Sequence, residues 1–155
     1  MPTKHEIDFH NLTDLHWNSL GQSSLSGSLL KLFASLDNHF LSLAERWKAR
    51  EYLFPPFLAA SQMHKLDYFK SFPHLITIPV VMNDEQDNLK NFSEQPFKSD
   101  KSLALGSLAP VQQVLTPAAC YHFYDEMEGS KLAQTQFLTT RCVCYRREKE
   151  YAPLQ

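Results

Sequence analysis

The chain has 155 residues, enough for one domain with a single hydrophobic core. Apolar residues make up 43% and aromatic residues 12% of it, which excludes an intrinsically disordered chain. Fifteen basic against seventeen acidic residues give a formal charge of -2. This balance gives no support to a nucleic-acid partner, because proteins that neutralise many phosphates are usually basic.

Hydropathy and cysteine content predict a cytoplasmic protein. No stretch comes near eighteen uninterrupted apolar residues, so no membrane span is predicted. The first residues are polar and lack the apolar core of a signal peptide. The three cysteines, Cys120, Cys142 and Cys144, form no disulfide framework.

Residues 1–26 are mixed in composition and rich in serine towards their end, which predicts an irregular arm with a short strand or turn near Ile7 to Leu15. The arm holds His5, His10 and His16. Their spacing matches no compact metal motif, so surface histidines are the favoured interpretation.

A long helix is predicted from Ser28 to Arg50. Apolar residues recur there at alternating steps of four and three: Leu29, Phe33, Leu36, Phe40, Leu43 and Trp47. This spacing places an apolar stripe along one helix face, and ordinary core packing accounts for most of such a stripe. Ser28 is expected to cap the start of the helix.

The next segments are shorter. In order, we predict a strand, a helix, an aromatic turn and an apolar strand, at residues 51–54, 58–65, 66–72 and 75–82. Pro55-Pro56 ends the first strand, and Pro79 argues against a central position for the last one. Polar residues 83–102 predict a long loop, which is either an ordered excursion or a mobile flap. Segments of strand-like or buried character at 103–108 and 111–115 follow, then a helical turn within 118–127.

Residues 137–148 have the β-branched and aromatic composition of a strand. Alternation would place six side chains on one face: Leu138, Thr140, Cys142, Cys144, Arg146 and Glu148. The guanidinium of Arg146 and the carboxylate of Glu148 could then grip a nucleotide. The alternative is a solvated strand end. Cys142 and Cys144 could form half of a metal site, but no second pair completes it, so core packing is favoured.

Four motifs in order carry a family resemblance. Tyr145-Arg146-Arg147-Glu148 has the form of motif 2 of class II aminoacyl-tRNA synthetases. The other three are Pro117-Ala118-Ala119-Cys120-Tyr121, Phe54-Pro55-Pro56, and the run from Tyr68 to Leu75. The chain thereby resembles the amino acid:[carrier protein] ligases, which are similar to the catalytic core of the atypical, methanogen-type seryl-tRNA synthetases. The resemblance spans roughly residues 45 to 155 and is weakest over 82–103.

The resemblance implies an α/β (α+β) fold, in which a partial antiparallel sheet of the class II synthetase type lies beside a long motif 1 helix. Residues 1–26 would be the arm, and 27–155 the N-terminal part of the catalytic domain. Motif 3 is absent from the chain, so we expect it to be a truncated portion without activity of its own. A homodimer is expected, because the motif 1 strand helps to build the dimer interface in this family.

The implied activity of the full-length family has two steps. ATP activates a small amino acid as its adenylate, and the aminoacyl group then passes to the phosphopantetheine thiol of an acyl or peptidyl carrier protein. Magnesium accompanies ATP, and the family binds zinc. Neither a membrane nor a nucleic acid is an expected partner.

The resemblance also assigns roles to three residues. Arg146 would contact the α-phosphate, and Glu148 would orient the adenine or the substrate amine. Cys120 would be the first zinc ligand, with the remaining glutamate and cysteine beyond position 155, so this chain should not hold zinc tightly. The alternative for Cys120 is a small buried side chain.

Three hypotheses follow. The chain is the N-terminal part of an active ligase, or a non-catalytic paralogue that serves binding or dimerisation, or a degenerate reading frame.

Overall fold

The computed structural model describes residues 12–18 and 20–152. The chain divides into two compact units. The first unit comprises Met1–Tyr52, Leu132–Thr140 and Glu148–Gln155, and the second comprises Leu53–Lys131 and Arg141–Arg147. The predicted boundary between an arm of residues 1–26 and a domain of residues 27–155 stays a prediction.

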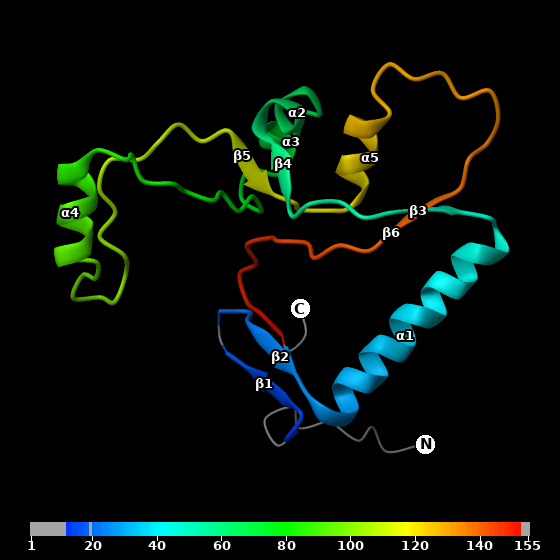
Figure 1. Ribbon diagram of the computed structural model, residues 1–155, viewed down its shortest axis with the longest axis horizontal. Coiled ribbons are helices and arrows are strands. Elements are labelled where there is room, and N and C mark those ends of the chain that lie inside the picture. Colours follow the sequence, from blue (N-terminus) through cyan, green and yellow to red (C-terminus); the bar gives the residue numbers. More distant parts are fainter. Residues whose placement is uncertain (1–11, 19, 153–155) are drawn as a thin grey trace. The chain divides into compact units, whose positions relative to one another are not determined.

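The first unit begins with an antiparallel strand pair, which leads into the long helix (Figure 1). Strand β1 (Leu15–Trp17) pairs with β2 (Ser23–Leu25), and Leu15 lies opposite Leu25. The side-chain oxygen of Asn18 accepts hydrogen bonds from the backbone N–H groups of Leu20 and Gln22 and so holds the turn between the strands. His16 lies exposed on β1, whereas His5 and His10 lie outside the described residues.

Helix α1 (Gly27–Arg46) confirms the long helix that the apolar period predicts. Its cap differs from the prediction. Asp14, rather than Ser28, supplies the capping oxygen: its carboxylate accepts from the Ser28 backbone N–H at 2.8 Å and from the Ser28 hydroxyl. These bonds lower the pKa of Asp14. Gly27 has φ 50°, and a Cβ there would lie 2.5 Å from the Asp14 carboxylate, so this junction needs glycine.

The apolar stripe of α1 is not core. No residue of the helix is buried. Four stripe residues are largely exposed, at 59% for Phe33, 49% for Leu36, 65% for Phe40 and 64% for Trp47. Trp47 packs on Phe137, with 5.3 Å between ring centroids. The expectation that core packing accounts for most of the stripe is therefore wrong for the described residues.

Strand β3 (Arg50–Tyr52) follows α1 and pairs in parallel with β6 (Leu138–Thr140). A strand directly after the helix is confirmed. The predicted strand over 137–148 is wrong in length, because only three of its residues have a strand partner. Single backbone bonds hold part of the remainder, which belongs to the second unit.

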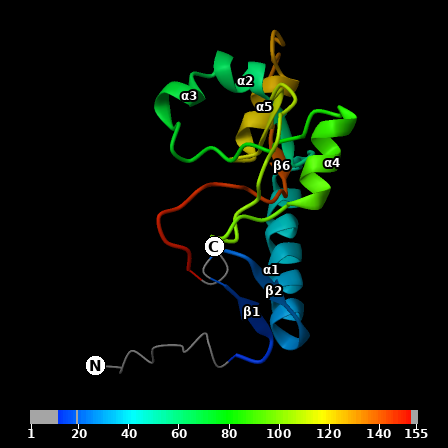
Figure 2. The same ribbon diagram turned by 90° about the vertical axis from the view of Figure 1, so that its left-hand side faces the viewer.

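The second unit contains most of the core. Strand β4 (Phe57–Ala59) pairs antiparallel with β5 (Gln113–Leu115), and helices α2 (Ala60–Lys65) and α3 (Tyr68–Ser71) follow β4. Figure 2 shows these two helices beside each other. Four buried apolar residues of this unit form one cluster: Leu58, Met63, Tyr68 and Val114. Helix α5 (Cys120–Glu126) confirms the helical segment expected within 118–127.

Three predictions for the second unit are wrong. The segment 103–108 forms no strand and is largely exposed: Leu103 and Leu108 make only isolated bridges, to Phe97 and Met82. The apolar run 75–82 forms no strand; only Met82 makes an isolated bridge, to Leu108. Pro79 lacks the backbone N–H that a ladder needs, which limits pairing there. The predicted loop 83–102 contains helix α4 (Gln86–Glu94), which Figure 1 shows away from α2, α3 and α5. Asn88 fixes α4, since its side-chain amide donates to the carbonyls of Asn83 and Ser107.

The sheets are smaller than the single sheet that was expected. They are three two-stranded pairs, two antiparallel and one parallel, within the described residues. Across the same residues, every helix falls short of the length and apolar character needed to cross a bilayer.

Candidate functional site

Arg146 lines a small cavity in the second unit. The cavity has a volume of about 160 Å³. Its other walls are almost entirely aromatic or apolar: Tyr68, Phe72, Leu75, Pro117, Ala118 and Tyr121. A single guanidinium in such surroundings favours an anion, because a carboxylate or phosphate can accept two parallel hydrogen bonds from it.

Backbone hydrogen bonds on both sides of Arg146 fix its position. The N–H of Tyr145 donates to the carbonyl of Thr116 at 2.8 Å, and the N–H of Arg147 donates to the carbonyl of Leu75 at 3.0 Å. Two donors two residues apart point to the same edge of an extended backbone. The backbone around Arg146 is therefore tied to two other segments of the second unit, although it does not continue β6.

Aromatic rings build one wall of this cavity. Tyr68 is buried, and its ring meets that of Tyr121 edge to face at 5.2 Å. Phe72 also lies near Tyr68, with 5.5 Å between the ring centroids. Burial raises the pKa of Tyr68, and the neighbouring Tyr121 adds to the rise, whereas the positive charge of Arg146 opposes it. Burial also raises the pKa of Tyr121, so both tyrosines stay neutral near pH 7 and can offer hydroxyl hydrogen bonds to a bound group.

A buried histidine, His122, contacts the segment that contains Thr116 and Pro117, next to the cavity. The Nε2 of His122 lies 2.9 Å from the hydroxyl of Thr116, and the ring also donates to the backbone carbonyl of Pro55. Phe54 stacks on the ring at 4.7 Å. Burial lowers the pKa of His122, so the neutral ring is favoured. These contacts hold Thr116 and Pro117 beside the cavity and tie them to the Pro55-Pro56 turn.

The three predicted site residues do not form one described cluster. Arg146 lines the cavity, and Cys120 lies exposed at the first position of α5 in the same unit. Glu148 belongs to the first unit, where it is half-buried and its N–H donates to the hydroxyl of Tyr151 at 3.3 Å. The predicted cooperation of Arg146 with Glu148 stays a prediction.

The described residues do not supply a metal site around Cys120. No three His, Cys, Asp or Glu side chains gather there or elsewhere between residues 12 and 152, residue 19 apart. The cavity walls likewise contain no carboxylate for magnesium, a cation that prefers oxygen ligands. The residues present therefore do not fit zinc or magnesium by themselves, and no reaction step is assigned to either metal.

Cys142 and Cys144 do not both lie in the hydrophobic core. Cys142 is half-buried and Cys144 is exposed. Their sulfur atoms lie 3.7 Å apart. The expectation of core packing is wrong for Cys144.

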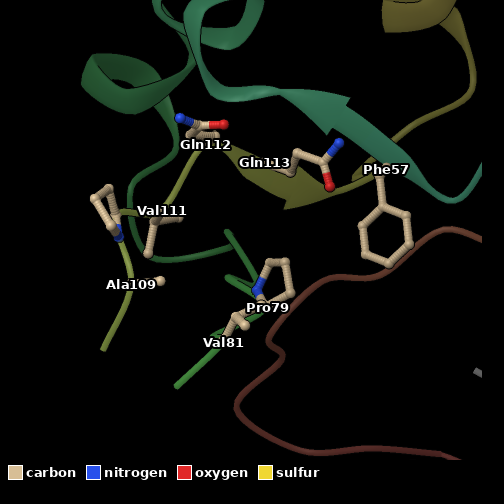
Figure 3. A pocket seen from close by; sticks show the side chains of 8 residues that line it. Phe57, Pro79, Val81, Ala109, Val111, Gln112 and Gln113 are labelled. Atoms are coloured by element: carbon tan, nitrogen blue, oxygen red, sulfur yellow. The ribbon is translucent and has the colours of Figure 1, made fainter. Parts of the chain in front are cut away.

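A second and larger cavity, of about 460 Å³, lies beside the β4–β5 pair (Figure 3). Its lining contains no titratable side chain: it consists of Phe57, Pro79, Val81, Ala109, Pro110, Val111, Gln112 and Gln113. This cavity can hold an apolar group but offers no acid, base or metal ligand.

Comparison with known proteins supports the resemblance that the motifs predict. No family model matches the chain. The chain is 34% identical over 71 residues to an amino acid--[acyl-carrier-protein] ligase 1 of Bradyrhizobium diazoefficiens. The predicted resemblance is confirmed. The match covers 46% of this chain and 21% of that ligase, so the chain spans about a fifth of the length of its curated relative.

A solved structure supports the fold. The chain is similar to the seryl-tRNA synthetase of M. kandleri, solved in complex with tRNASec of A. aeolicus, with a TM-score of 0.68. The similarity covers 86% of this chain and 27% of the synthetase, at 18% identity. The predicted α/β fold of the class II synthetase type is confirmed.

Proposed function

We propose that the chain is the N-terminal part of an ATP-dependent ligase. The ligase would activate a small amino acid as its adenylate and transfer it to the phosphopantetheine thiol of a carrier protein. The observation that carries this proposal is the position of Arg146 in the aromatic cavity, at the residue where the motif places the phosphate-binding arginine. The partial match to an amino acid--[acyl-carrier-protein] ligase supports the same reaction class.

Arg146 would stabilise charge that develops on the α-phosphate while the amino acid carboxylate attacks it. A donor that is already held in place costs little reorganisation during the reaction, and both neighbouring backbone bonds hold Arg146. Tyr68 and Tyr121 would exclude water from one side of the reacting groups. Glu148 would orient the adenine or the substrate amine, and Cys120 would contribute one zinc ligand to a set completed by residues outside this chain.

A second candidate is a non-catalytic module for binding or dimerisation. The exposed stripe of α1 favours it, because large apolar side chains such as Phe33, Phe40 and Trp47 are more than half exposed. Contiguous apolar surface of this kind usually marks an interaction site. In an active ligase the same stripe would serve a homodimer, so the two candidates differ in catalysis rather than in association.

Amino-acid-dependent exchange of pyrophosphate into ATP separates the two candidates. The reading frame is extended downstream of Gln155, and the longer protein is assayed with glycine, alanine and serine beside the 155-residue chain. We expect exchange in the longer protein and none in the chain alone, whose cavity has one cation and no carboxylate for magnesium. A longer protein that folds but gives no exchange, or a frame that closes at Gln155, would favour the non-catalytic module.

A further inference from the structure

Cys142 and Cys144 form a close dithiol immediately before the segment that holds Arg146. Their Sγ atoms lie 3.7 Å apart, and one thiol hydrogen-bonds the other. Cys144 is exposed, so small reagents can reach at least one of the two sulfurs. Neither thiol takes part in the proposed reaction, which leaves the pair without an assigned role.

The spacing allows a disulfide but does not favour a relaxed one. Residues i and i+2 of an extended chain have Cα atoms about 6.6 Å apart, close to the upper end of the range that disulfides span. Closing the bond would bring the sulfurs to about 2.05 Å and contract the backbone. Strained or exposed disulfides are easily reduced, and labile bonds of this kind are the regulatory ones.

We propose that Cys142 and Cys144 form a reversible disulfide when the protein meets a small-molecule disulfide such as oxidised glutathione. The thiolate of Cys144 attacks one sulfur of the reagent and releases one glutathione thiolate, which leaves a mixed disulfide. Cys142 then attacks the Cys144 sulfur, forms the internal disulfide and releases the second glutathione thiolate. The two cysteines lose two electrons and two protons, and one oxidised glutathione becomes two reduced molecules.

The order of attack follows from the environment of the two thiols. Burial and the hydrogen bond with Cys144 raise the pKa of Cys142 to about 11, so its thiolate is scarce at neutral pH. Exposed Cys144 is the side chain that the reagent meets first. Once the mixed disulfide has formed, Cys142 is adjacent, and its proximity compensates for the small thiolate fraction.

Oxidation would also act on the cavity; this part of the inference rests on the proposed function. Contraction between Cys142 and Cys144 pulls on Tyr145, whose N–H bond to Thr116 is one of the two that hold Arg146. We expect the oxidised chain to lose that bond and to present Arg146 less well to an anion.

Peptide mapping gives a direct test. Trypsin cuts after Arg141 and Arg146, so one short peptide contains Cys142 and Cys144 but not Cys120. After incubation with oxidised glutathione, we expect this peptide to lose two hydrogen atoms and to regain them with dithiothreitol. A peptide that stays reduced, carries only glutathione, or is linked to another chain would overturn the proposal.

Matched variants sharpen the result. Cys120→Ser should leave the internal disulfide unchanged, whereas Cys144→Ser should abolish it and leave at most a mixed disulfide on Cys142. Binding of an ATP analogue to the longer protein, reduced and oxidised, tests the coupling to Arg146. Weaker binding in the oxidised form supports it, and equal binding in both forms overturns it. If neither form binds while the disulfide forms, the proposed function fails and the dithiol assignment stands.

Discussion

Arg146 and Arg147 are adjacent and carry the same charge, but only Arg146 lines the cavity. In the longer protein we expect Arg146→Ala to slow adenylate formation by about 10²–10³-fold, the usual loss when one charge-stabilising donor is removed. Arg146→Lys should recover little, because an ammonium cannot reproduce the two-pronged contact of a guanidinium. Single-turnover formation of the adenylate is the measurement.

Arg147→Ala is the matched control for this prediction. The variant removes the same charge, and it keeps the backbone N–H that donates to Leu75. Adenylate formation should therefore stay close to that of the unchanged protein. Equal losses in both alanine variants, with folding intact, would mean that net charge rather than the cavity position of Arg146 matters.

We expect His122 to make the stability of the second unit depend on pH. Its pKa is lowered from the ordinary value of 6.5, so between these two values the unfolded chain binds more protons than the folded one. The contribution of His122 to the free energy of unfolding should therefore be fully present above about pH 6.5. It should be lost as the pH falls towards the lowered pKa of the folded state. His122→Gln should flatten this part of the profile in urea titrations at pH 5 to 8, whereas an unchanged slope would exclude His122 as its cause.

The hydroxyl of Thr116 allows a separate test of the same contact. Thr116→Val keeps the volume but leaves Nε2 of buried His122 without its partner, which should cost about 1–3 kcal/mol of unfolding free energy. Urea denaturation of this variant at pH 8, where the histidine is neutral, checks the value. A loss near zero would mean that another group replaces the threonine hydroxyl.

The sequence could mark the residues that line the cavity, but not the contacts among them. A local motif of an aromatic residue followed by Arg-x-Glu marks the arginine. The other cavity residues lie on two segments, Tyr68 to Leu75 and Pro117 to Tyr121, and only tertiary packing brings these to Arg146. One feature of the sequence could have indicated the contact between Thr116 and His122. Thr116 lies two residues after buried Val114, so the alternation of side chains along a strand places it on the same inward face.

Among the elements, α1 combines an apolar period with the absence of any fully buried residue. We expect the isolated chain to self-associate through this stripe, and we expect Phe40→Glu to reduce that association by placing a charge in its centre. Sedimentation at tens of micromolar, as an order of magnitude, measures it. Asn38→Glu adds the same charge on the opposite face of the helix and should have little effect. A chain that is monomeric before substitution would contradict the prediction.

Elements with local signals could be predicted, whereas those that depend on partners could not. The apolar period of α1 is such a local feature. The segment 137–148 has strand composition throughout, but its pairing ends where β3 ends, after three residues. Helix α4 was missed because only two apolar residues, Leu89 and Phe92, mark it, and long-range bonds of Asn88 fix it.

At the scale of the whole molecule, the core is distributed unevenly between the units. Leu15 is the one buried apolar side chain described for the first unit. The second unit buries Leu58, Met63, Tyr68 and Val114 in one cluster. Because burial of apolar surface is the main favourable term in folding, the second unit should be the more stable one.

Native-state hydrogen exchange can test this division. We expect the slowest exchange in β4, α2 and β5, and faster exchange in α1, whose side chains are all at least partly exposed. Met63 is completely buried, so Met63→Ala should cost about 2–5 kcal/mol and speed exchange throughout the second unit. Leu15→Ala is the matched change in the first unit and should affect the β1–β2 pair alone. If Met63→Ala accelerated exchange in α1 to the same extent, the two units would unfold as one.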